Sequence, residues 1–137
     1  MPVHLHLSDN RRYLIYEISE PLTMDELIKA YEQEREYRDA LPYTVHSIVD
    51  MSQLRRIPAN WLTAKAGPGL KHPRSGEMLI VGVSVGIRMI MDMLFKITGY
   101  KRMRFFTTRA EADTYMAQLV QATEAAATAE PPAADQP

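Results

Sequence analysis

The sequence contains no cysteine, and its charges nearly cancel. Without cysteine the protein forms no disulfide and offers no thiolate as a nucleophile or as a ligand for zinc or an iron–sulfur cluster. The 16 lysines and arginines are interspersed with 17 aspartates and glutamates, so the formal net charge is −1. A chain with this balance sets up no long-range field for a phosphate backbone, which argues against nucleic acid as a partner.

Long apolar runs are missing as well. No stretch approaches the roughly 20 apolar residues that a membrane-spanning helix needs, and the first residues lack the basic and apolar regions of a secretory signal peptide. Together with the absence of cysteine, these features predict a cytoplasmic protein. Apolar residues make up 46% of the sequence and charged residues 24%, a balance typical of globular domains.

The length of 137 residues suits one hydrophobic core. We expect a single domain over residues 1–124. Residues 125–137 are rich in alanine and proline and have little that could pack, so we expect a disordered tail there.

The chain begins with the pattern of a hairpin. Apolar residues alternate with histidines over residues 3–7, and residues 13–18 are rich in aromatic and β-branched side chains. The polar run Ser8-Asp9-Asn10-Arg11 between them is typical of a turn.

A capping box then predicts the first helix. Thr23 caps the first turn while Glu26 reaches back to it, and an apolar stripe follows, so we expect a helix over residues 23–39. The charged residues of its second half, Glu34 and Arg38 among them, are expected on a solvated face.

The rest of the chain alternates strands with helices. After the first helix we expect a strand at residues 43–49, a short helix at 58–66, a strand at 77–83, a helix ending near Gly99, a strand at 102–106 and a helix beginning at the capping box Thr108–Glu111. Such alternation packs as a mostly parallel or mixed sheet with helical crossovers. The predicted fold class is therefore α/β, with five strands, an N-terminal hairpin and about four helices.

The run Gly82-Val83-Ser84-Val85-Gly86 matches the nucleophile elbow of serine hydrolases and lies between a strand and a helix. A hydrolase of that type needs a histidine after the serine. The four histidines of this sequence all precede Ser84: His4, His6, His46 and His72. We therefore expect the glycines to allow a tight turn and Ser84 to cap the helix, and we predict that the protein is not an enzyme.

The sequence offers two other kinds of site, an anion site and a metal site, and favours neither. Amides at the start of this helix and Arg88, one turn in, together suit an anion, but no second phosphate-binding element supports such a site, so we favour a helix cap with a solvent-facing arginine. His4 and His6 share a strand face, but no recognisable motif adds a third ligand. We expect neither a metal nor another cofactor.

The helix after Ser84 is apolar around most of its circumference. Only Arg88, Asp92 and Lys96, at four-residue steps, form a narrow polar stripe. The flanks are covered either by neighbouring helices of the same chain or by a methionine-lined contact with a partner or a second copy, which would give a homodimer. The sequence leaves both open.

The run Ile48–Ile57 resembles the strand and loop of STAS domains, the anti-sigma-factor-antagonist-like fold, in which an aspartate, an apolar residue and a serine precede a helix. In this sequence that triplet is Asp50-Met51-Ser52. The hairpin, the first helix and the later alternation agree with the resemblance, which spans roughly residues 12–120 and is closest to the SpoIIAA-like branch of bacterial proteins.

The resemblance implies a regulatory domain that binds a protein partner near one end of the sheet. In regulatory STAS domains a serine at the start of the second helix accepts phosphate. Asn60 stands there in this sequence, so that switch is not implied. Ser52 and Thr63 flank this position and offer hydroxyls, although a turn and a helix surface explain them as well. Trp61 is either the anchor of the interface or a core residue.

We therefore expect a cytoplasmic, non-enzymatic signalling domain of a bacterial regulatory system. The expected partner-binding residues are Ser52, Asn60, Trp61, Thr63, Ser84 and Arg88. The alternative is a small-ligand or lipid carrier with an enclosed cavity beneath the apolar helix, and a hydrolase that uses Ser84 is a third possibility.

Overall fold

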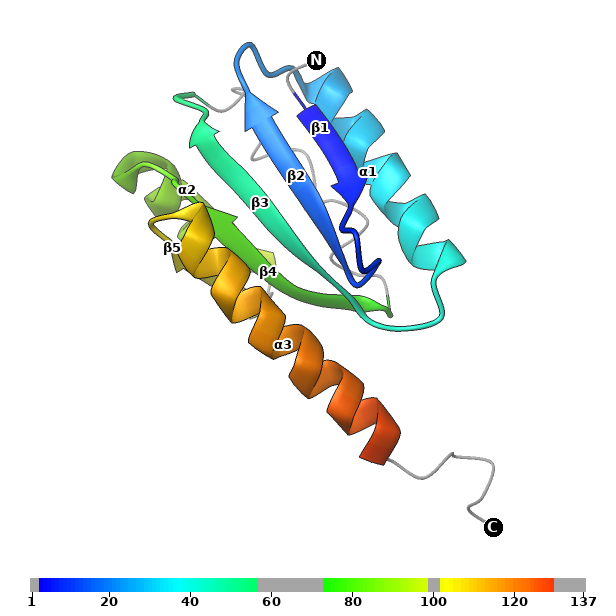
Figure 1. The fold of residues 1–137 in the computed structure, drawn as a ribbon. Coiled ribbons are helices and arrows are strands. Elements are labelled where there is room, and N and C mark those ends of the chain that lie inside the picture. The colour runs from blue at the N-terminus through cyan, green and yellow to red at the C-terminus, as the bar shows by residue number, and fades with distance from the viewer. Residues whose placement is uncertain (1–2, 57–72, 99–101, 130–137) are drawn as a thin grey trace.

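A computed structural model describes residues 3–56, 73–98 and 102–129, which form an α/β domain (Figure 1). Its strands are β1 (Val3–Leu7), β2 (Tyr13–Ser19), β3 (Val45–Gln53), β4 (Ser75–Val81) and β5 (Met103–Phe106). The helices of these ranges are α1 (Met24–Ala40), α2 (Val85–Thr98) and α3 (Arg109–Ala129). The predicted helix at 58–66 lies outside the described residues.

The five strands form one mixed sheet in the order β1-β2-β3-β4-β5. β1 pairs antiparallel with β2 around the predicted turn, and the other neighbours pair in parallel. The α/β class, the five strands and the N-terminal hairpin are thus confirmed. The threonine half of both capping boxes is confirmed too, because the Thr23 and Thr108 hydroxyls accept from the amides of Glu26 and Glu111.

The helices cover both faces of the sheet (Figure 1). On one face, α1 and α2 pack against alternate residues of the strands, including Tyr16, Val49 and Ile80. On the other face, α3 packs against the residues between them, such as Ile48 and Leu79. Because side chains of a strand alternate between the faces, the middle strands β3 and β4 are largely buried on both sides, which explains the continuous apolar run Met78–Val81 of β4.

Among the described residues, α3 covers only part of its side of the sheet. It packs against β3, β4 and β5, whereas β1 and β2 form the edge of the sheet beyond it (Figure 1). Leu5 and Leu7 point toward the α1 side, so His4 and His6, which alternate with them, lie on the α3 side of the sheet. The hairpin therefore presents a polar strip beside α3.

The prediction that Glu34 and Arg38 face solvent is wrong. Their exposed fractions are 6% and 2%, and their side chains form an ion pair of 2.8 Å between α1 and the sheet. The Tyr16 hydroxyl donates to Glu34 at 2.6 Å, and Arg38 donates to the Val45 carbonyl at 3.1 Å. Burial, and then the Glu34 carboxylate, raise the pKa of Tyr16 well above its ordinary value.

The last helix is longer than expected. α3 continues to Ala129, past the boundary at residue 124 where we placed the start of the tail. Alanine has the highest intrinsic helix propensity, so an alanine-rich segment extends an existing helix readily. An ion pair of 2.9 Å between Arg12 and Glu124 also ties this part of α3 to the hairpin. Residues 130–137 lie outside the described residues.

In the described ranges, no helix combines the length and the apolar character that crossing a bilayer requires.

Candidate functional site

The turn between β4 and α2 is built around Gly82 and Ser84. Gly82 has a φ of +70°, and a Cβ atom there would lie 2.7 Å from the Cβ of Ser52. The Ser84 hydroxyl accepts from the amide of Ile87 at 3.3 Å, and its carbonyl accepts from the amide of Arg88 at 2.8 Å. The expected cap is confirmed. Of the two flanking glycines, only Gly82 is needed for the turn, because nothing lies within 4 Å of a Cβ at Gly86.

The described histidines are engaged away from Ser84. His46 Nδ1 accepts from the Glu77 amide at 2.9 Å, so its Nε2 carries the proton and donates to Thr123, also at 2.9 Å. His4 and His6 lie on β1 beside Glu17. Within the described part of the chain, the Ser84 hydroxyl therefore has the hydrogen bond of a helix cap and no histidine partner.

Ser52 lies at the carboxyl end of β3, which runs three residues past the expected polar turn at Asp50. One oxygen of Asp50 accepts from the Ser52 amide at 3.0 Å and from its hydroxyl at 2.6 Å. The other oxygen lies 3.6 Å from Arg109 of α3. These local hydrogen bonds agree with the expectation that Ser52 serves a turn.

Arg88 is exposed, as expected, but it has an aromatic partner that the sequence did not indicate. Its guanidinium carbon lies 4.4 Å above the ring of Phe105 in β5. A cation over an aromatic face is weakly stabilised there. Arg88 is therefore held beside the edge strand.

The helix α2 has one buried side and one exposed apolar side. Ile87 and Met91 pack into the core against the sheet. Val85, Met89 and Met93, four residues apart, are 76%, 68% and 50% exposed, and we call them the α2 stripe. Core packing thus covers Ile87 and Met91 but leaves the α2 stripe exposed, so the contact of this side with a partner or a second copy stays a prediction.

The expected partner-binding residues are only partly placed. Ser52 and Ser84 both lie at the carboxyl end of the parallel strands, where Gly82 approaches Ser52 closely, and Arg88 lies one turn further along α2. Asn60, Trp61 and Thr63 lie outside the described residues. Both sequence-based interpretations of Trp61, as an interface anchor and as a core residue, therefore stay predictions.

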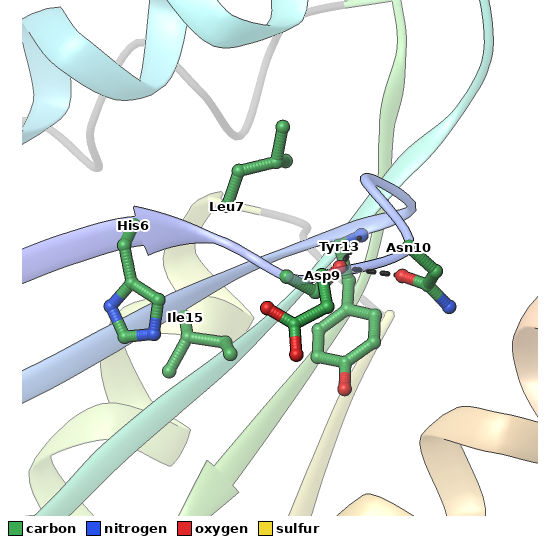
Figure 2. A pocket seen from close by; sticks show the side chains of 7 residues that line it. His6, Leu7, Asp9, Asn10, Tyr13 and Ile15 are labelled. Atoms are coloured by element: carbon green, nitrogen blue, oxygen red, sulfur yellow. Dashed lines mark hydrogen bonds between the residues drawn. The ribbon is translucent and has the colours of Figure 1, made fainter.

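A half-open pocket of about 340 Å³ lies beside the hairpin, away from α2 (Figure 2). Its lining comes from β1, the turn and β2: His6, Leu7, Ser8, Asp9, Asn10, Tyr13 and Ile15. Burial, and then the Asp113 carboxylate, raise the pKa of Tyr13. The largely polar lining differs from the enclosed apolar cavity beneath α2 that the carrier hypothesis needs.

The hairpin also assembles a cluster that sequence reasoning missed. The strand register places Glu17 directly opposite His4, and His6 lies on the same face of β1. One ligand atom from each of the three lies within 4.8 Å of the others. The signal was present in the sequence, because pairing around the turn at Ser8–Arg11 brings residue 17 to residue 4.

No protein-family model matches the sequence, and neither does any curated protein. The likeness to STAS domains therefore depends on the Asp50-Met51-Ser52 triplet and on the order of strands and helices.

Proposed function

We propose that this chain is a non-enzymatic, STAS-like domain that binds a regulatory protein partner through the α2 stripe and the adjoining end of the sheet. The observation that carries the proposal is the exposure of Val85, Met89 and Met93 in a row on a regular helix. Neighbouring residues of the same helix are buried in the core, so the stripe is apolar surface left over after folding.

Burial of this surface favours binding. Covering a valine or methionine side chain completely contributes about 1.5–3 kcal/mol. Side chains at i, i+4 and i+8 follow one line along a helix, which is how a helix presents itself to an apolar groove. Methionine adapts its shape to such a groove because it is unbranched and polarizable.

The surroundings of the stripe supply the polar rim of an interface. Arg88 and Lys96 are exposed on the same helix, the Ser84 hydroxyl caps its amino-terminal end, and Ser52 lies beside Gly82 just before this helix. Both hydroxyls are held by local hydrogen bonds, which supports a positioning role over a reactive one. Charged groups around an apolar centre favour selectivity for one partner.

Site-specific photo-crosslinking tests the proposal. A benzophenone amino acid at position 89 is introduced in the cells that produce the protein. On illumination it should form one discrete crosslinked adduct with the bound partner. The control is the same amino acid at position 118, which is exposed on α3. Equal labelling at the two positions, or none at position 89, contradicts the proposal.

A second copy of this chain is the other possible occupant, through a two-fold contact between α2 helices. Light scattering of the purified protein separates the cases. If the wild type is a dimer and Met89→Lys is a monomer, the α2 stripe is the surface of self-association. If the wild type is a monomer, the protein crosslinked at position 89 is a different protein.

A further inference from the structure

Apart from the α2 stripe, the structure contains a cluster of His4, His6 and Glu17 on the hairpin that the proposed function does not use. We propose that these three side chains bind a divalent transition-metal ion of the zinc class and leave a coordination position open to solvent. This site is independent of the α2 stripe, and it departs from the sequence-based expectation of no metal.

The backbone holds the ligands in place. His4 and Glu17 are direct partners across two hydrogen-bonded antiparallel strands, and His6 is two residues further along the same face. The Nδ1 atoms of His4 and His6 lie 3.9 and 3.8 Å from one oxygen of Glu17. Zinc bonds near 2.1 Å place tetrahedral ligand atoms about 3.3–3.4 Å apart. Side-chain rotations that move these atoms by about half an ångström close that difference for the two nitrogen–oxygen pairs.

The spacing suits an ion better than it suits direct contacts. Both nitrogen–oxygen distances exceed hydrogen-bond range. The Nδ1 atom of His6 is buried and has no hydrogen-bond partner in the described structure. The two imidazole rings are 5.1 Å apart and tilted by 40°, and both Nδ1 atoms lie near the same Glu17 oxygen. A cation placed among them gives all three groups a partner at once.

The ligand set selects the kind of metal. Two imidazoles and one carboxylate suit zinc, cobalt, nickel, copper or ferrous iron, whereas magnesium and calcium prefer oxygen ligands. Three protein ligands leave at least one position for water or another small ligand. The side chains of His4, His6 and Glu17 are 71%, 40% and 50% exposed, so that position is reachable from solvent.

Calorimetric titration with Zn²⁺ at pH 7.5 tests the site, on the full chain purified without a polyhistidine tag and stripped with chelator. One equivalent should bind, and Mg²⁺ should not. His4→Ala, His6→Ala and Glu17→Gln should each weaken binding at least about 100-fold, since even groups that only support a metal ligand change affinity 10–100-fold.

The matched control is Glu32→Gln, which removes an exposed carboxylate from α1 and should bind Zn²⁺ like the wild type. Circular dichroism checks that each variant stays folded. Absence of saturable one-to-one binding in the wild type overturns the proposal, and so does wild-type affinity in any of the three ligand variants.

Discussion

Replacing Arg38 with methionine removes one partner of the buried ion pair under α1. Methionine keeps most of the side-chain volume, so the change isolates the charge and its hydrogen bonds. The Glu34 carboxylate, 6% exposed, retains the hydrogen bond from Tyr16 but loses its counter-ion, and the Val45 carbonyl loses the guanidinium as donor.

The expected loss follows from burial. Breaking a buried ion pair by removing one partner costs about 3–5 kcal/mol, because the remaining charge lies uncompensated in the low-dielectric interior of the protein. An exposed pair of the same kind contributes about 0–1 kcal/mol. Arg38→Met should therefore lower the free energy of unfolding by at least about 3 kcal/mol, a large share of the 5–15 kcal/mol typical of a domain.

Urea denaturation at pH 7, followed by circular dichroism, measures the loss. The double variant Arg38→Met, Glu34→Gln removes the uncompensated charge while the amide oxygen still accepts from Tyr16, so it should recover part of the stability. Partners in direct contact couple by about 0.5–3 kcal/mol, and this pair should be in the upper half of that range. A loss below about 1 kcal/mol in the single variant would refute the buried-pair argument.

Three further predictions concern His46, the two glycines that flank Ser84, and Ser84 itself. Burial lowers the pKa of His46 below 6.5 in the folded state. As the pH falls below 6.5 the unfolded chain therefore binds a proton before the folded chain does, so the free energy of unfolding should fall until the pH passes the folded pKa. Urea denaturation at pH 7.5 and at pH 5.5 should show this loss, and the loss should be smaller in His46→Gln. Gly86→Ala should stabilise the protein by about 0.5–1 kcal/mol, because a Cβ atom there meets open space at a helical position. Gly82→Ala should destabilise it, because Gly82 has a positive φ and a Cβ atom there would contact Ser52. Thermal denaturation of the two variants measures both effects. Ser84→Ala should cost about 1 kcal/mol through the lost cap, and wild type and variant should both remain unlabelled by a serine-directed fluorophosphonate probe.

Local signals in the sequence predict most of the fold. The turn at Ser8–Arg11, the threonine caps at Thr23 and Thr108, and the apolar run of β4 each depend on a few neighbouring residues, and all are found in the structure. The alternation of these elements is enough to indicate a mixed α/β sheet, because helical crossovers place successive strands in parallel.

Features that depend on distant residues escaped the same reasoning. Glu34 and Arg38 look like solvated residues of α1 because a helical pattern counts charge as exterior. Their burial is made possible by Tyr16 of β2 and the carbonyl of Val45 in β3, which lie next to them only after the sheet has formed. Likewise Glu17 joins the two histidines through the register of the hairpin, which a search for contiguous metal motifs does not consider.

The two proposed sites lie on opposite faces of one sheet, which makes them separately testable. The helix α2 packs on the face that contains Tyr16 and Ile80, whereas His6 and Glu17 belong to the α3 side of β1 and β2. Changes that share no contacts act independently. Met89→Lys should therefore abolish partner binding and leave Zn²⁺ affinity unchanged, and His6→Ala should do the reverse. Loss of both activities in either variant would mean that the domain had unfolded or that the two faces are coupled, and the circular dichroism of the variant decides between these outcomes.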